Sequence, residues 1–227
     1  MQTTTSYNKS VKFTYGLNES LLVKCADIMK RMSAGDLLDV GCSTGEWAAY
    51  WMERGWRCSG IDIDEEHIAI SRGRGIEARH CDLNKEKLPF ENESFDLIFA
   101  GEVIEHLIDT DFFLSELYRC LKPGGRALIT TPNLVSLENR LRILLGIYPI
   151  WVNYNLSGPG HVRAYSPSVL KKQLREHSFR VVLHKGNWVP FVPQRFLNDL
   201  QFPALSITGD WFPNLSMDII IVAQRDA

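Results

Sequence analysis

The stretch Asp36-Leu-Leu-Asp-Val-Gly-Cys-Ser-Thr-Gly45 is a hydrophobic run that leads directly into a glycine turn. A helical pattern begins immediately afterwards, at Glu46. A strand, a glycine turn and a helix in this order let the backbone approach a nucleotide-like ligand at the carboxyl end of the strand. The stretch therefore predicts an α/β fold with a ligand site where its first strand ends.

The alternation of apolar runs and helical patterns continues along the chain. Strands are predicted at residues 36–41, 57–62, 77–83, 95–100, 126–131, 179–184 and 217–224. Helices are predicted at 21–32, 46–54, 65–72, 111–121 and 167–177, with Lys122-Pro-Gly-Gly125 as the stop after the fourth of them. Strands that alternate with helices in this way form parallel sheets with crossover connections. We predict a doubly wound, seven-stranded and mostly parallel sheet.

Length and composition limit what the protein can be. The 227 residues carry 25 Lys and Arg against 27 Asp and Glu, so bulk charge does not favour a nucleic-acid partner. We expect one domain over 1–227, with a lead-in helix within 1–34 and candidate lid insertions at 134–165 and 186–216. No secretory signal or transmembrane segment is expected, so we expect a cytoplasmic protein with reduced cysteines. The oligomeric state stays open.

Acidic residues occur at the ends of three successive predicted strands. Asp39 lies just before the glycine turn, where a fixed negative charge repels a pyrophosphate and suits an ammonium group. Asp62 ends the second strand, at a position from which a carboxylate accepts hydrogen bonds from ribose hydroxyls, and Asp82 ends the third. The turn lacks the G-x-G-x-x-G pattern, because Ser43 replaces the second glycine, and no G-K-[ST] follows. These features disfavour NAD and ATP as ligands.

Five pieces of the chain, in this order and spacing, resemble the class I S-adenosylmethionine-dependent methyltransferases, particularly the branch with the ubiquinone-biosynthesis O-methyltransferases. The resemblance extends from Leu37 to Asn133, less than half of the chain. The matching pieces are Leu38–Gly45, Gly60–Asp64, Cys81–Leu83, Phe95–Leu107 and Leu121–Gly125. It implies a Rossmann-like methyltransferase fold and S-adenosylmethionine as the cofactor.

The resemblance also implies roles for individual residues. Asp39 and the loop would hold the methionine part, Asp62 the ribose, and Asp82 with Leu83 the adenine. Ile63 would pack on the adenine face. The remaining implied contacts to the methionine part are Gly41, Cys42, Ser43, Thr44 and Gly45 of the loop, with Ala100 and Gly101 beneath it. Ser43 stands where the family usually has glycine, and it should be tolerated if its φ is negative.

The segment Glu102-Val-Ile-Glu105-His106 follows the fourth predicted strand and supplies the catalytic candidates. If it begins a helix, Glu102, Glu105 and His106 share one face. His161, in the first lid candidate, is placed to reach the same crevice. The pattern resembles the E-x-x-E-H and distant histidine that bind a divalent metal in small-RNA 3′-end methyltransferases. A metal site, a histidine general base without metal, and a purely structural role all stay open.

These observations predict an enzyme that transfers a methyl group in line to a small or lipophilic acceptor, more readily at oxygen than at nitrogen or carbon. Three alternatives stay open: a non-catalytic S-adenosylmethionine-binding module, a metal-assisted methyltransferase acting on an RNA end, and a nicotinamide-dependent oxidoreductase. Aromatic residues outside the sheet would form either an apolar acceptor pocket or the core of the insertions; they are Trp151, Tyr154, Tyr165, Trp188, Phe191, Trp211 and Phe212.

Overall fold

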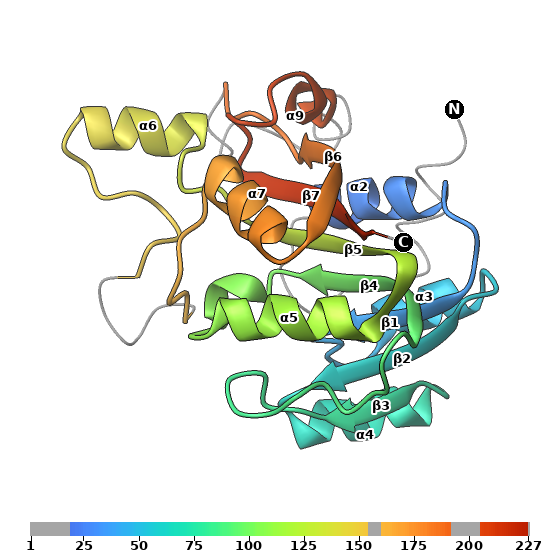
Figure 1. Ribbon diagram of the computed structural model, residues 1–227. Coiled ribbons are helices and arrows are strands. Elements are labelled where there is room, and N and C mark those ends of the chain that lie inside the picture. Colours follow the sequence, from blue (N-terminus) through green and yellow to red (C-terminus); the bar gives the residue numbers. More distant parts are fainter. Residues whose placement is uncertain (1–18, 154–159, 192–204, 227) are drawn as a thin grey trace.

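The computed structural model describes residues 19–153, 160–191 and 205–226, and these form a single sheet covered by helices on both faces (Figure 1). The strands are β1 (Asp36–Val40), β2 (Arg57–Asp62), β3 (Glu77–His80), β4 (Phe95–Gly101), β5 (Leu121–Pro132), β6 (Phe179–Gly186) and β7 (Asp218–Arg225). Their order is β3-β2-β1-β4-β5-β7-β6, and β7 is antiparallel to both of its neighbours while the other pairs are parallel. The predicted seven-stranded, mostly parallel sheet is confirmed.

The helices lie close to their predicted positions. They are α2 (Glu19–Met29), α3 (Glu46–Met52), α4 (Glu65–Gly73), α5 (Thr110–Cys120), α6 (Leu137–Leu144), α7 (Pro167–Glu176) and α9 (Ile207–Trp211), with a short 3₁₀ turn η1 (Ile104–His106). Ser166 caps α7 by accepting from the Val169 N–H, as Ser-Pro at a helix start predicts. The sequence pattern did not predict α6, which lies inside the first lid candidate.

Successive side chains along each strand point to opposite faces of the sheet, and this divides the core into two layers. In β1, Leu37 packs in the layer under α2 and α3, whereas Leu38 packs in the layer under α5 and α7. In β4, Leu97 and Ile98 divide between the layers in the same way. Side chains on successive strand residues point to opposite faces, and both faces are buried, which explains the nearly continuous apolar runs.

Helix α5 ends at Cys120, directly before the expected stop at 122–125, but the next strand begins earlier than the predicted residue 126. β5 begins at Leu121 and continues through these residues, and the register against β4 jumps from Phe95 opposite Leu121 to Leu97 opposite Arg126. The extra residues are accommodated as an irregularity with Gly124 at φ +77°. Pairing to β4 therefore overrides the local tendency of proline and glycine to end a strand.

The insertion after β5 is closed at its base. Asn133 and Tyr165 form a parallel bridge, and the Leu134 N–H donates to the Tyr165 carbonyl at 2.8 Å. The segment between them carries α6, which projects beyond the sheet (Figure 1). Within the described ranges, no helix has the length and apolar character needed to cross a membrane. All five cysteines are buried free thiols.

Candidate functional site

The glycine loop after β1 turns in the left-handed region at three alternate residues. Gly41 has φ +73°, Ser43 +47° and Gly45 +81°. A negative φ, the condition under which serine should be tolerated at this position, is therefore not met: Ser43 adopts the conformation that glycine would favour. Its N–H donates to Asp62 Oδ2 at 2.8 Å, and this bond holds the loop against the end of β2.

Gly45 does not clear space for a ligand, in contrast to the expectation from the sequence. A Cβ on Gly45 would lie 2.5 Å from Ile76 Cδ1 and 2.6 Å from Ser71 Oγ, so this glycine lets the loop pack against the interior. A Cβ on Gly101 would likewise lie 2.6 Å from the Phe99 ring. Gly41 does border open space, next to Val103.

A cavity of about 210 Å³ lies at the carboxyl ends of the first strands. Its walls include five of the predicted cofactor residues, namely Gly41, Asp62, Ile63, Asp82 and Leu83. The side of the cavity that faces η1 is formed by Glu102, Val103, His106 and Leu107. Ile63 is 62% exposed, which leaves its side chain free to pack on a planar ligand. Cys42 and Ala100 are buried and do not line the cavity.

Polar atoms without partners gather beside this cavity. Asp39 is only 3% exposed, and its Oδ2 has no hydrogen-bond partner. Burial raises the pKa of its carboxyl to about 7, and the charge of Asp62 adds to the rise. Ser43 Oγ and Thr44 Oγ1 are also buried without partners. Buried polar atoms are normally satisfied, so these atoms fit a site for a polar, ammonium-bearing ligand such as S-adenosylmethionine.

The other two predicted acids already hold parts of the site in place. Asp62 accepts from the Ser43 and Asp64 N–H groups, at 2.8 and 3.0 Å. Asp82 pairs with Lys85 at 2.7 Å and accepts from the Asn84 N–H, and these contacts lower the pKa of its carboxyl. Each carboxylate oxygen has a second lone pair, so both side chains keep acceptor capacity toward the cavity.

Glu102 does not share a face with Glu105 and His106, because no α-helix begins at this point. Glu102 has φ +56°, and only the single turn η1 follows. Its Oε1 accepts from Thr130 Oγ1 at 2.9 Å, and its N–H reaches the Thr130 carbonyl at 3.2 Å. The predicted helical tripod of these three residues is therefore wrong, and Glu102 is tied to β5.

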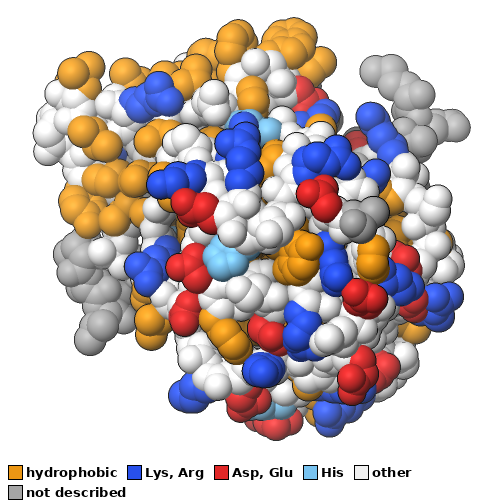
Figure 2. Space-filling model, viewed as in Figure 1, with side chains coloured by type: hydrophobic (Ala, Val, Ile, Leu, Met, Phe, Trp, Pro, Cys, Tyr) orange, Lys and Arg blue, Asp and Glu red, His pale blue; other side chains and the backbone are white. Residues whose placement is uncertain are grey.

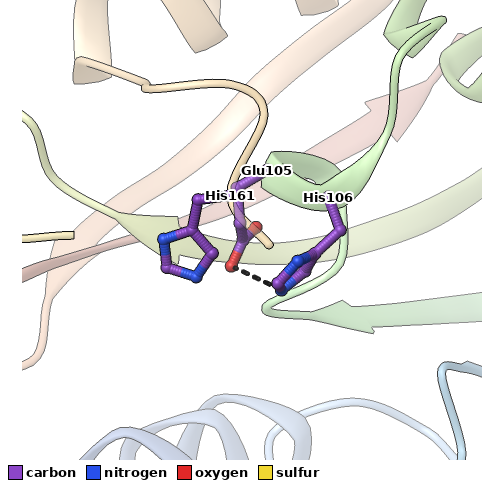
Figure 3. Close-up of side chains that lie close together, drawn as sticks. All are labelled: Glu105, His106 and His161. Carbon is purple, nitrogen blue, oxygen red and sulfur yellow. Dashed lines mark ion pairs between the residues drawn. The ribbon is translucent and has the colours of Figure 1, made fainter. Parts of the chain in front are cut away.

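A different trio comes together instead: Glu105, His106 and His161 (Figure 3). One potential ligand atom from each residue lies within 4.8 Å of the others. The two imidazole rings meet edge to face, and His106 Nε2 lies 4.0 Å from Glu105 Oε1. The structure thus brings together three of the four predicted catalytic residues, from η1 and from the insertion.

The backbone of Glu105 positions His161. The Glu105 carbonyl accepts from the N–H groups of Val162 and Arg163, at 2.8 and 3.0 Å. His161 Nδ1 lies 2.9 Å from the Trp151 carbonyl oxygen, so this nitrogen carries the proton and Nε2 is left as the acceptor. These bonds fix the imidazole from both sides.

Burial changes the proton affinity of Glu105 and of His106. Glu105 is 1% exposed; its Oε2 accepts from Thr131 Oγ1, while Oε1 has no partner. Burial raises the pKa of the Glu105 carboxyl to about 7. Burial and then the neighbouring His161 lower the pKa of His106, which keeps that imidazole neutral near pH 7.

Asp218 is an acid that sequence reasoning missed. It begins β7 opposite Pro132, and burial raises the pKa of its carboxyl to about 7. Burial also raises the pKa of Glu102, and the charges of Asp218 and Glu105 add to that rise. An acid at a strand start gives no local signal of this kind, because its charged neighbours come from other strands.

The aromatic residues outside the sheet do not form one pocket. Tyr165 and Trp188 are core residues, as the alternative reading of the insertions predicts. Trp151, Phe191, Trp211 and Phe212 are exposed. Tyr154 lies outside the described residues.

Comparisons with known proteins agree with this architecture. A family model described as "Methyltransferase domain" matches residues 17–184. A probable S-adenosylmethionine-dependent methyltransferase of Mycolicibacterium smegmatis is 37% identical over 108 residues, 47% of this chain and 41% of that protein. A ubiquinone biosynthesis O-methyltransferase of Sinorhizobium fredii is 34% identical over 101 residues, 43% of this chain and 41% of that protein. The chain spans about half or less of the length of these relatives.

Solved structures share the fold. A SAM-dependent methyltransferase from Thermotoga maritima superposes with a TM-score of 0.66 at 21% identity, covering 92% of this chain and 88% of that one. A second, from Archaeoglobus fulgidus, has a TM-score of 0.62 at 20% identity and covers 91% and 94%. With the family model matching most of its length, this chain belongs to the class I S-adenosylmethionine-dependent methyltransferases.

Proposed function

We propose that this protein transfers a methyl group from S-adenosylmethionine to a hydroxyl oxygen of a small or lipophilic acceptor. The observation that carries the proposal is the shared cavity: His106 lines the same walls as Gly41, Asp62 and Asp82. A group able to take a proton therefore lies beside the residues expected to hold the cofactor. When bound, S-adenosylmethionine supplies a methyl group on a sulfonium, and the protein's main tasks are positioning and proton removal.

Different residues hold different parts of the cofactor. Asp39 holds the ammonium group, Asp62 the ribose hydroxyls, and Asp82 the adenine. The unpartnered Asp39 Oδ2 and the exposed Ile63 side chain support this assignment. Ala100 and Gly101 end β4 beneath the methionine part as backbone support only.

His106 acts as the general base, and His161 and Glu105 support it. A neutral imidazole is the form that accepts a proton, and the lowered pKa of His106 provides it at neutral pH. The carboxylate of Glu105, 4.0 Å from His106 Nε2, stabilises the imidazolium once it forms. The insertion 134–165 supplies His161, so we propose that it covers the acceptor side of a single domain, with 186–216 as a second lid.

Oxygen is the preferred acceptor atom for two reasons. A hydroxyl needs a base to become a competent nucleophile, and this site provides one. Relatives named malonyl-[acyl-carrier protein] O-methyltransferase and ubiquinone biosynthesis O-methyltransferase also support it.

A metal-assisted mechanism is the second candidate. Glu105, His106 and His161 offer one carboxylate oxygen and two imidazole nitrogens within 4.8 Å of one another, a donor set suited to a divalent cation. A bound cation would lower the pKa of the acceptor hydroxyl. This is the alternative that connects the site to an RNA end, which carries vicinal hydroxyls.

Titration calorimetry with S-adenosylhomocysteine and with NAD, each with and without magnesium or zinc, tests the cofactor class and the metal together. We expect binding of S-adenosylhomocysteine and none of NAD. Binding of NAD would point to the oxidoreductase alternative. Methyl transfer from radiolabelled S-adenosylmethionine to a panel of phenols, enols and acyl carboxylates then tests the activity. Cofactor binding without transfer to any acceptor class would favour the non-catalytic module.

A further inference from the structure

The helix α6 has its polarity reversed relative to an ordinary surface helix. Asn139, on its inner side, is 1% exposed and exchanges hydrogen bonds with the backbone of Ile150, at 2.8 and 3.3 Å. On its outer side, Leu144 is 80% exposed and Leu141 is exposed as well. A water-facing helix normally shows the opposite arrangement, with polar residues outside. The outer face of α6 therefore suits an apolar medium.

The apolar side chains continue beyond the helix. Figure 2 shows hydrophobic side chains gathered over α6 and the segment around it. We name this patch the α6 surface, and its exposed members are Leu141, Ile143, Leu144, Leu145, Ile147, Tyr148 and Trp151. Contiguous exposed patches of this kind mark interaction sites on soluble domains.

The shape and charge of the α6 surface favour one occupant. The helix projects from the body of the domain (Figure 1), and a helix that lies in a bilayer interface must be accessible along its apolar side. Within 137–153 there are two arginines and one glutamate, so the patch carries a small positive charge. Arg142 pairs with Glu138 at 3.3 Å, which leaves Arg140 as the exposed cation beside the leucines. Tyr148 and Trp151 are aromatic residues of the kind that settle at headgroup level.

We propose that the α6 surface docks on the interface of a lipid bilayer, with the leucines in the acyl boundary and Arg140 at the headgroups. The patch adjoins the catalytic trio, because the Trp151 carbonyl is bonded to His161 and Ile150 and Trp151 lie beside Glu105. Docking would bring the acceptor side of the site to the membrane surface. This inference does not depend on which atom is methylated.

Vesicle co-sedimentation of the full chain tests the docking, with phosphatidylcholine alone and with added phosphatidylglycerol. We expect the protein to pellet with both, and a few-fold more strongly with the anionic lipid. The double variant Leu144→Asp/Leu145→Asp should lower the partition coefficient at least about tenfold. The matched control is Ile70→Asp/Val169→Asp, which places the same charges at exposed apolar positions on α4 and α7 and should leave binding unchanged.

S-adenosylhomocysteine affinity, measured on all variants, separates docking from folding and from the proposed activity. It should be the same in the wild type and both double variants, because the substituted side chains are exposed. Wild-type protein that stays in the supernatant with both vesicle types overturns the proposal. So does sedimentation velocity that shows a dimer lost in Leu144→Asp/Leu145→Asp without any vesicle binding, because the occupant is then a second copy of the chain.

Discussion

The imidazole rings of His106 and His161 lie edge to face with their centroids 4.8 Å apart, although one follows β4 and the other comes from the insertion after β5. In Figure 3 the carboxylate of Glu105 is seen between the two rings. Asp39 and Asp62, which we propose hold the cofactor, belong to other strands. Proton transfer and cofactor binding should therefore respond to different substitutions.

His161→Ala should lower turnover, though by less than the about 10²–10⁴-fold expected for loss of the base His106, and should leave S-adenosylhomocysteine affinity nearly unchanged, because His161 contacts the imidazole of the base. Steady-state rates and calorimetry measure the two effects. His177→Ala is the control, since His177 pairs with Asp111 and belongs neither to the trio nor to the cavity walls. Unchanged turnover in His161→Ala would remove His161 from the site.

Removal of divalent cations distinguishes the two mechanisms. If His106 is a base without metal, turnover should persist in EDTA. Glu105→Gln should then reduce the rate only moderately, about tenfold, since the imidazolium loses a stabilising charge. Loss of activity in EDTA that magnesium or zinc restores in the wild type, but not in Glu105→Gln, would instead establish the metal-assisted mechanism.

Cofactor affinity should depend on pH through Asp39. The carboxyl has a pKa of about 7 in the cofactor-free protein, and an ammonium partner keeps it ionised in the complex, so binding below pH 7 releases a proton. Affinity for S-adenosylhomocysteine should rise with pH, by at most about tenfold per unit, and level off above pH 7. Calorimetry between pH 5 and 8 measures this slope.

Asp39→Asn should bind more weakly and with a flatter pH profile. The same substitution should increase the free energy of unfolding at pH 8 by about 1–3 kcal/mol, because a raised folded-state pKa means that stability is lost as pH rises toward 7. Urea unfolding measures this. A loss of stability in Asp39→Asn would show that the carboxylate has a structural role instead.

Ser43→Gly should stabilise the protein by about 0.5–1 kcal/mol, because glycine relieves the cost of a left-handed conformation at φ +47°. Ser178, at φ +63° after α7, provides the matched control, and Ser178→Gly should give a similar gain far from the cofactor. If Ser43→Gly alone weakens S-adenosylhomocysteine binding, the buried Ser43 hydroxyl contacts the cofactor.

The elements of the fold were predictable because their signals are local. Consecutive apolar residues such as Leu37 and Leu38, whose side chains point to opposite faces, indicate strands that are buried on both faces. The Ser166-Pro167 pair marks a helix start. The passage of β5 through Pro123 and Gly124 was not predictable, since pairing with β4 decides it. The reversed polarity of α6 also hid that helix, because its pattern lacks a buried apolar face.

The site residues also differ in whether local sequence or contacts with distant segments decide their positions. Asp62 ends β2 and Asp82 follows two residues after the end of β3, and both line the cavity because strand order places the ends of these strands side by side. The prediction that Glu102 shares a helix face with Glu105 and His106 was wrong for two reasons. Its side chain accepts a hydrogen bond from Thr130 on the neighbouring strand, and its positive φ is incompatible with the assumed helix. Asp218 was missed for a related reason: burial against residues from distant segments, not its own neighbours in the chain, gives it an unusual proton affinity.

The two N–H bonds from Val162 and Arg163 to the Glu105 carbonyl act as a clamp between the insertion and the turn η1. Replacing the insertion with the corresponding loop of another methyltransferase would thus change the spacing of the two imidazoles even if both histidines were kept. Substrate range and proton-transfer geometry would therefore evolve together. A loop graft designed for new acceptors would need to keep these two hydrogen bonds to the Glu105 carbonyl.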